Sequence, residues 1–196
     1  MLDAWVAEQA PRFQGRVVNV GAGEDRQTYG RRVVRVDAFA PQPDVRADLG
    51  TGLPFADRAF DGGVCTEVLE HVSDARLLLA ELARVLKPGA RLLVSVPFIF
   101  HYHADPRDFL RFTPPGLAAE LERSGFEVEF VGGIGGRLTA LALWIESLAM
   151  PLKLAVRVLS LAAGPVLTHR RPRADRWSPW AAHVVAIAHR RQHANP

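Results

Sequence analysis

Glycines and an acidic residue follow two short β-branched runs near the start of the chain. Residues 17–20 (VVNV) lead into Gly21, Ala22 and Gly23, and residues 33–36 (VVRV) end at Asp37. Glycines let a backbone approach a ligand closely, and a carboxylate at the end of a strand can accept hydrogen bonds from the two hydroxyls of a ribose. The pattern predicts a βαβ unit that binds a nucleotide, with a plain tight turn as the alternative.

The residues after Gly23 argue against a phosphate ligand. The dinucleotide fingerprint G-x-G-x-x-G continues here with Glu24, Asp25 and Arg26, and the Lys-Ser/Thr ending of a P-loop is missing. Two carboxylates at the start of a helix would repel a phosphate that the helix N-terminus should attract. S-adenosylmethionine fits better, because it has a ribose, a sulfonium, an ammonium and one carboxylate but no phosphate. We therefore predict it as the cofactor.

Strand and helix signals alternate along the chain and must position these residues. The sequence predicts helices at residues 2–10, 73–86 and 113–125, and strands at residues 16–20, 33–36, 45–49, 60–66, 91–96, 126–131 and 183–188. Ser73 is the expected cap of the second helix, and Lys87-Pro88-Gly89 is its expected stop. Such alternation indicates an open α/β sheet, whose ligands bind beyond the carboxyl ends of the strands. We expect the residues at those ends to converge: Gly21, Asp37, Thr66 and Pro97.

Composition places the chain among single-domain globular proteins. It has 196 residues, of which 48% are hydrophobic, enough for one buried core. The single cysteine, Cys65, excludes a disulfide framework and a cysteine-based zinc site. The net charge is only +3 and the basic excess gathers at residues 169–173 and 190–191, so we expect no nucleic-acid partner. No leader peptide is apparent, and a cytoplasmic location is the expectation.

Three further segments extend the pattern formed by residues 17–25 (VVNVGAGED) and Asp37. They are DLGTGLPFADRAFD at residues 48–61, CTEVLEHV at 65–72 and ELARVLKPGARLLVSVP at 81–97. In this order they closely resemble the class I S-adenosylmethionine-dependent methyltransferases, in particular the group called methyltransferase type 11, over residues 15–130. The resemblance implies a Rossmann-like, mostly parallel seven-stranded sheet with helices on both faces and an antiparallel last strand. It also implies a single methyltransferase domain over residues 1–196.

The resemblance assigns cofactor contacts residue by residue. It implies that the methionine part of the cofactor contacts Asn19, Gly21, Ala22 and Gly23, and that the ribose contacts Asp37. It places the adenine beside Asp48 and Leu49, and the transferring methyl beside Thr66, Glu67 and Val68. Two residues depart from the family pattern, which usually has an acid at the position of Asn19 and often a third glycine at that of Asp25. An amide at Asn19 should weaken a contact with the cofactor's ammonium without abolishing it.

Several charged residues also have a purely structural interpretation. Asp48 can cap a turn. Glu67 and Glu70 can form a solvated helix start that the helix dipole stabilises. His71 helps to build the turn in that interpretation and takes no part in chemistry.

The segment after the fifth strand, residues 97–117, is rich in polar and aromatic side chains, and loops on a rigid sheet often carry function. Its pattern H-x-x-P-x-D-F-x-R-F-T at residues 103–113 resembles a subset of these methyltransferases found among proteins of cell-surface polysaccharide biosynthesis. An oxygen or nitrogen acceptor can need a base, and an imidazole titrates near neutral pH. His103 is therefore the first candidate base and His101 the second. Tyr102, Asp108 and Arg111 are the candidate substrate-binding residues.

Two alternatives concern the same segment. Asp108 and Arg111 stand three residues apart and can form an ion pair that merely shapes the loop. A metal cluster of His101, His103 and Asp105 would be an incomplete ligand set, and type 11 members usually need no metal, so no metal site is predicted.

An apolar stretch precedes the last predicted strand. Residues 138–150 carry one charge, Glu146, and residues 152–163 follow after Pro151. A membrane-spanning helix needs about 20 apolar residues in a row, which Pro151 and the charges prevent. We expect a helical insertion at about residues 137–168 that caps the sheet and the pocket. A homodimer interface or a peripheral membrane contact through residues 138–163 is the alternative.

These observations together predict methyl transfer to a small-molecule, glycan-like or lipid-linked acceptor, at oxygen or nitrogen. A lipid-linked acceptor would place the protein at the membrane periphery. The alternatives are a non-catalytic S-adenosylmethionine-binding module, favoured by Asn19 and Asp25, and a nicotinamide-dependent oxidoreductase. Asp37 fits the oxidoreductase, but Glu24 and Asp25 do not.

Overall fold

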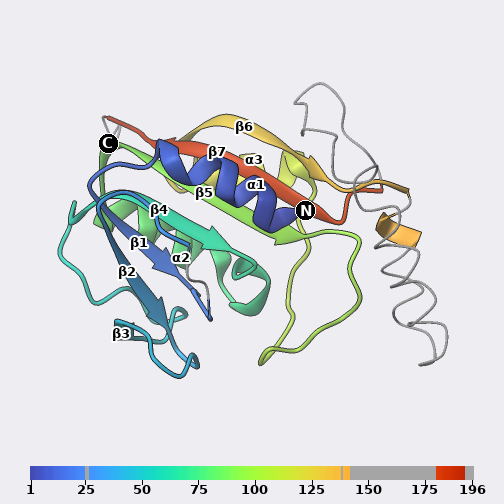
Figure 1. Cartoon of the computed structure of the whole chain (residues 1–196), viewed down its shortest axis with the longest axis horizontal. Helices are drawn as coiled ribbons and strands as arrows, with labels where there is room; N and C mark the ends of the chain where they lie inside the picture. Colours follow the sequence, from blue (N-terminus) through green and yellow to red (C-terminus); the bar gives the residue numbers. More distant parts are fainter. Residues whose placement is uncertain (25–26, 138, 142–179, 193–196) are drawn as a thin grey trace.

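The computed structural model describes residues 1–24, 27–137, 139–141 and 180–192, and in this part of the chain seven strands form one sheet. The strands are β1 (Arg16–Val20), β2 (Arg32–Asp37), β3 (Val45–Arg46), β4 (Phe60–Thr66), β5 (Leu86–Pro97), β6 (Phe126–Ile134) and β7 (His183–Arg190). Their order is β3-β2-β1-β4-β5-β7-β6 (Figure 1). The pairs from β3 to β5 are parallel, and β7 runs antiparallel to both β5 and β6. This confirms the mostly parallel Rossmann-like sheet with an antiparallel last strand.

Helices cover both faces of the sheet. Successive side chains of a strand point to opposite faces, so one strand contributes to the two cores on either side. The helix α1 (Leu2–Gln9), in front of the sheet in Figure 1, contributes Trp5 to a core that includes Val17. The helices α2 (Ala75–Val85) and α3 (Pro114–Arg123) contribute Leu78 and Leu117 to a second core that includes the next residue, Val18. The near-continuous apolar runs in β1, β4 and β5 follow from this burial on two sides.

The ends of α2 and α3 show where local sequence rules hold. Thr113 caps α3, and its hydroxyl oxygen accepts a hydrogen bond from Gly116 N at 3.2 Å, as predicted. The predicted cap of α2 is wrong by one residue, because Asp74 is the cap and accepts from Leu77 N at 3.0 Å. The helix ends at Val85 as expected, but β5 begins at once at Leu86. The expected stop at residues 87–89 therefore lies inside a strand, where the pairing with β4 shifts its register.

The connection from β1 to β2 departs from the expected βαβ unit. Residues 21–24 and 27–31, the described part of this connection, are not helical. Tyr29 is fully buried and its ring meets that of Phe13 at 5.6 Å, while Arg31 N and Arg32 N both donate to the Gly15 carbonyl. These contacts anchor the connection as a loop. The predicted third strand is also shorter than expected, with only Val45–Arg46 paired to β2.

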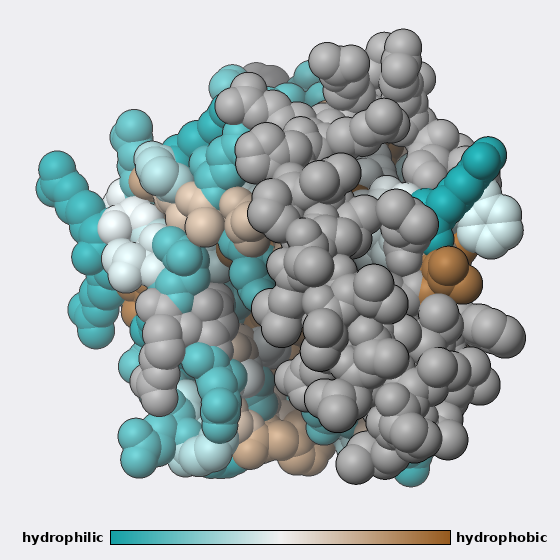
Figure 2. All heavy atoms as spheres, turned by 45° about the vertical axis from the view of Figure 1, so that its right-hand side comes forward, coloured by the Kyte–Doolittle hydropathy of each residue, from teal (hydrophilic) through white to brown (hydrophobic). Residues whose placement is uncertain are grey.

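Large apolar side chains are exposed at a few separate places in the described residues. The face in Figure 2 shows mostly hydrophilic residues where the atoms are coloured. Two of the exposed aromatic side chains, Phe39 and Phe109, line the pocket described below. No helix in the described part of the chain has the length and apolar character to cross a membrane. The expected apolar insertion at 137–168 lies almost wholly outside the described residues, as do the dimer and membrane contacts proposed for it.

Candidate active site

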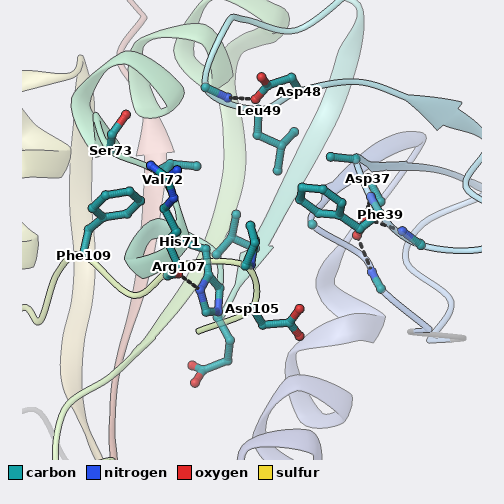
Figure 3. A pocket seen from close by; sticks show the side chains of 18 of the residues that line it. Asp37, Phe39, Asp48, Leu49, His71, Val72, Ser73, Asp105, Arg107 and Phe109 are labelled. Atoms are coloured by element: carbon teal, nitrogen blue, oxygen red, sulfur yellow. Dashed lines mark hydrogen bonds between the residues drawn. The ribbon is translucent and has the colours of Figure 1, made fainter. Parts of the chain in front are cut away.

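A pocket of about 860 Å³ opens beyond the carboxyl ends of the parallel strands. It is bounded by the loops after β1, β2, β3 and β4 and by part of the segment after β5. Figure 3 shows Asp37 and Phe39 on one side of this pocket and His71 and Phe109 on the other. The lining residues are Gly21, Gly23, Glu24, Asp37, Ala38, Phe39, Ala40, Pro41, Asp48, Leu49, Gly50, Thr51, Glu67, Val68, His71, Val72, Ser73, Asp105, Pro106, Arg107 and Phe109. Of the four residues predicted to converge, Gly21 and Asp37 line this pocket, whereas Thr66 and Pro97 do not.

Asp37 is an ionised acceptor at the end of β2. Its Oδ2 accepts from Gly23 N at 2.8 Å, and its Oδ1 accepts from Phe39 N at 2.7 Å and Ala40 N at 2.8 Å. Burial alone would raise the pKa of Asp37, but the hydrogen bonds from Ala40, Gly23 and Phe39 outweigh it and lower that pKa. A carboxylate offers about four lone-pair sites, so the backbone leaves acceptor capacity for a ligand hydroxyl.

Gly21 and Gly23 keep the backbone accessible between β1 and the pocket. Both have left-handed φ, +63° and +52°. A Cβ on Gly21 would lie 2.2 Å from Val68 Cγ2, whereas a Cβ on Gly23 would meet no atom within 4 Å. Gly21 is therefore needed for close packing on Val68, and the space beside Gly23 belongs to the pocket. Such a cradle fits a ligand that lies directly against the backbone.

Asp48 and Leu49 line the pocket after β3, as predicted. Asp48 also caps a turn, because its Oδ1 accepts from Gly50 N at 2.9 Å and its carbonyl accepts from the Thr51 hydroxyl at 3.0 Å. The turn-capping interpretation is thus confirmed, and it leaves the second carboxylate oxygen for other contacts. Leu49 is buried and offers an apolar wall.

Glu67 ends β4 in a strained conformation. Its φ is +54°, which is rare for a residue with a side chain. Its Oε1 accepts from the Ser95 hydroxyl at 2.7 Å, and its Oε2 lies 3.0 Å from His183 Nδ1. Sequence reasoning overlooked Ser95 and His183. A serine within the apolar run of β5 was the available signal for the first of them.

Glu70 is completely buried in a short turn of 3-10 helix, Leu69–His71. Among the described residues, neither of its carboxylate oxygens has a hydrogen-bond partner. Burial, with the charge of Glu67 nearby, raises the pKa of Glu70 to about 8. The interpretation of Glu67 and Glu70 as a solvated helix start is therefore wrong, because the segment after β5 folds over this turn.

His71 ties that segment to the turn. Its Nδ1 lies 2.6 Å from the Arg107 carbonyl, and since a carbonyl only accepts, Nδ1 carries the proton. Phe109 N donates to the Glu70 carbonyl at 2.7 Å. The turn-building role expected for His71 is confirmed, and its ring also faces the pocket.

Asp108 and Arg111 form an ion pair, as the structural interpretation of these two residues predicted. Both guanidinium Nη atoms of Arg111 bond the Asp108 carboxylate, and Arg111 Nη1 also donates to the Leu110 carbonyl at 2.8 Å. The Arg111 guanidinium holds the pKa of Asp108 well below its usual range. Asp108 Oδ2 accepts from His103 N at 3.1 Å. The pair shapes the loop from within and does not line the pocket.

The other predicted residues of this segment lie at the pocket's edge or outside it. His101 is exposed and stacks on Phe100, and Tyr102 is 72% exposed. His103 is half-buried, with its ring 4.9 Å from that of His71. His103 therefore lies beside His71 at the edge of the pocket, and His101 does not lie there. Three predicted cofactor residues are likewise absent from the lining, namely Asn19, Ala22 and Thr66.

Part of the chain is similar to known methyltransferases. Residues 6–94 match the family model of a methyltransferase domain. An O-methyltransferase of Aspergillus nomiae is 40% identical over 86 residues, which cover 39% of this chain and 38% of that protein. A demethylmenaquinone methyltransferase of Symbiobacterium thermophilum is 34% identical over 101 residues, which cover 50% of this chain and 39% of that protein. The chain spans about two fifths of the length of such curated relatives.

A solved structure shares the fold at low identity. It is the 1,6-didemethyltoxoflavin-N1-methyltransferase of Burkholderia thailandensis, with 1,6-didemethyltoxoflavin and S-adenosylhomocysteine bound. It matches with a TM-score of 0.60 at 18% identity, over 96% of this chain and 76% of that one.

Proposed function

We propose that the chain is a class I S-adenosylmethionine-dependent methyltransferase of the type 11 group, and that it methylates an oxygen or nitrogen atom of a small-molecule acceptor. The relatives matched at moderate identity include O-methyltransferases, which favours oxygen. A glycan-like molecule is the acceptor class that the pattern at residues 103–113 favours, and a lipid-linked acceptor would suit a membrane contact through residues 138–163.

The observation that carries the proposal is the pocket around Asp37. S-adenosylmethionine supplies an electrophilic methyl group on its sulfonium when it is bound. Asp37 would hold the ribose, Gly21 and Gly23 would carry the methionine part, and Asp48 and Leu49 would face the adenine. The volume and the open glycine backbone described above fit a ligand of this size and shape.

Positioning contributes much of the catalysis in this proposal. The strained Glu67 is fixed by Ser95 and His183, so the end of β4 is rigid at the place where the family holds the transferring methyl. Phe109, 44% exposed at the pocket, offers an apolar surface to the acceptor. His103, beside His71, remains the first candidate to take a proton from the acceptor.

The nicotinamide alternative finds little support in the loop after β1. Dinucleotide sites place the pyrophosphate on a helix N-terminus, and residues 21–24 and 27–31 form no helix. Glu24 at the pocket would also repel a phosphate.

Incubation with methyl-labelled S-adenosylmethionine and fractionated small molecules tests the proposal. We expect label in at least one fraction with the native protein and none with heat-denatured protein. Binding of S-adenosylhomocysteine without transfer to any fraction would favour the non-catalytic binding module. Binding of NAD in its place would favour the oxidoreductase.

A further inference from the structure

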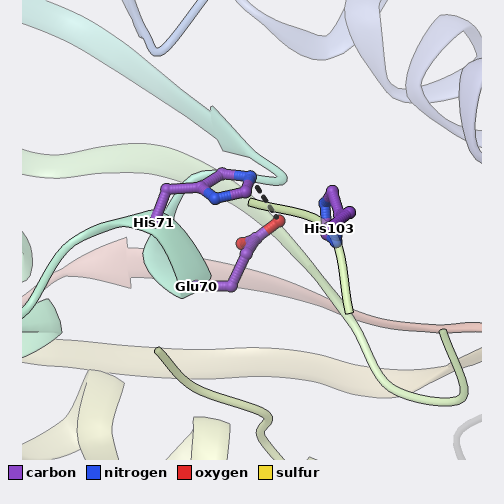
Figure 4. A group of neighbouring side chains, drawn as sticks. All are labelled: Glu70, His71 and His103. Atoms are coloured by element: carbon purple, nitrogen blue, oxygen red, sulfur yellow. Dashed lines mark ion pairs between the residues drawn. The ribbon is translucent and has the colours of Figure 1, made fainter. Parts of the chain in front are cut away.

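Two segments of the chain bring a carboxylate and two imidazoles together beside the pocket. Glu70 and His71 come from the turn after β4, and His103 comes from the segment after β5. Figure 4 shows the three side chains facing one another. One ligand atom of each lies within 4.8 Å of the other two, and His71 Nε2 is 3.6 Å from Glu70 Oε1.

The buried carboxylate needs a partner. Glu70 is fully buried, and within the described residues neither oxygen accepts a hydrogen bond. Leaving such a group without one is costly. Glu67 and Asp108 lie close enough to act on Glu70, and the one nearby guanidinium, that of Arg111, already pairs with Asp108. The surroundings therefore hold an excess of acidic groups, which favours a cation.

His71 is oriented as a metal-bound histidine usually is, and His103 has a carboxylate beside one ring nitrogen. A metal-bound imidazole commonly directs its other ring nitrogen at a carbonyl or a carboxylate. His71 Nδ1 donates to the Arg107 carbonyl at 2.6 Å and so leaves Nε2 toward Glu70. His103 Nδ1 lies 3.4 Å from Asp108 Oδ2. The Asp108 carboxylate, held by Arg111, would thus orient the ring of His103.

We propose that Glu70, His71 and His103 bind a divalent transition-metal ion of the zinc class at the edge of the pocket. Two imidazoles and one carboxylate suit such an ion better than the all-oxygen sets of Mg²⁺ and Ca²⁺. Tetrahedral bonds of about 2.0–2.2 Å would place ligand atoms roughly 3.4 Å apart. The Glu70–His71 pair already has this separation, and a movement of the His103 ring on the order of 1 Å completes the set. This departs from the expectation of no metal site, which considered His101, His103 and Asp105 and overlooked Glu70 and His71.

The ion would have a role at the acceptor, a point that rests on the proposed function. Three protein ligands leave a coordination position open. Since His71 lines the pocket, an acceptor hydroxyl could take that position and lose its proton more readily there. With the ion bound, His103 would be a ligand, and the ion would replace it as the group that promotes loss of the acceptor's proton. An oxygen acceptor is the class that this site favours.

Calorimetry with zinc alone tests the site. The full chain is used without a histidine tag, after treatment with a chelator, and is titrated with Zn²⁺ and, separately, with Mg²⁺. We expect one equivalent of Zn²⁺ to bind and Mg²⁺ to bind far more weakly. Glu70→Gln and His103→Ala should each weaken Zn²⁺ binding by more than about 100-fold. His189→Ala, which removes an imidazole at the far end of β7, should leave it unchanged.

Several outcomes would overturn the site: no bound Zn²⁺, equal binding by the Glu70→Gln and His103→Ala variants, or a preference for Mg²⁺. His103 is half-exposed, so its variant keeps the test decisive even where Glu70→Gln fails to fold. Titration of S-adenosylhomocysteine into the same samples separates the two proposals. Binding of S-adenosylhomocysteine without binding of Zn²⁺ would contradict the metal site and leave the proposed methyltransferase function in place.

Discussion

At the scale of single residues, the backbone of the site is more constrained than its side chains. Gly21 and Glu67 both have left-handed φ and stand at the ends of the adjacent strands β1 and β4. Gly21 lies against Val68, the residue after Glu67. A strained Glu67 beside a glycine that packs on the next residue, at the ends of a parallel strand pair, indicates a pre-organised site.

Substitution of Gly21 tests this constraint. Gly21→Ala adds a Cβ 2.2 Å from Val68 Cγ2 at a φ of +63°, so we expect it to lower the free energy of unfolding by about 2–3 kcal/mol. Gly23→Ala is the matched control. It has the same kind of φ with no neighbour within 4 Å, and should cost about 1 kcal/mol. Urea denaturation measures both, and equal losses would show that the contact with Val68 is unimportant.

At the scale of elements, two clamps hold loops onto the helical face. The Asp108–Arg111 pair and the His71–Arg107 contact fix the segment after β5. Arg84 and Glu81 of α2 fix the loop before β4, because Glu81 Oε2 accepts from Leu53 N at 2.8 Å. In both clamps, polar side chains bond backbone atoms of a loop. Such bonds hold loops that have little regular secondary structure of their own.

Arg111→Ala should loosen the first clamp. It leaves the buried Asp108 carboxylate without its guanidinium, so we expect faster amide hydrogen exchange in residues 98–113 and unchanged exchange in β4 and β5. Arg123→Ala, which removes an exposed arginine of α3, serves as the control. Unchanged exchange in residues 98–113 would mean that the ion pair does not hold the loop.

Glu81→Gln should change how stability depends on pH. The hydrogen bonds from Arg84 lower the pKa of Glu81 from 4.5 to about 2. A lowered pKa stabilises the fold above the unfolded value, and this contribution disappears as the pH falls from about 4.5 to about 2. We expect Glu81→Gln to lose about 1–2 kcal/mol at pH 7 and to match the wild type near pH 2. Thermal unfolding across this range, with exposed Glu122→Gln as control, checks it, and parallel curves for wild type and Glu81→Gln would contradict it.

At the scale of the whole molecule, the sequence predicted what depends on local pattern. The runs in β1, β4 and β5 are apolar because both faces are covered, and Asp37 is the last residue of β2. The cap of α2 was missed because Ser73 and Asp74 stand next to each other and both are residue types that commonly cap helices. No helix is found in the described residues between β1 and β2, where Tyr29 is buried against Phe13, a contact that no local pattern shows.

The rest of the site depends on contacts between distant parts of the chain. His183 reaches Glu67 across 116 positions of sequence, because the pairing of β5 with β7 places it opposite Pro97. Glu70 reads as a surface acid in its own segment and becomes buried only when the loop after β5 closes over it. Most of the residues predicted to bind the cofactor therefore line the pocket, and none of those predicted for the acceptor does.

The central claim is that Asp37 organises a pocket for S-adenosylmethionine, and calorimetric titration with S-adenosylhomocysteine tests it most directly. The wild type should bind, and Asp37→Ala should lose at least about tenfold in affinity, or 1.4 kcal/mol. Asp44→Ala, which removes an exposed carboxylate that bonds Arg35 N outside the pocket, should bind as the wild type does. No binding by the wild type, or equal binding by Asp37→Ala, would contradict the claim.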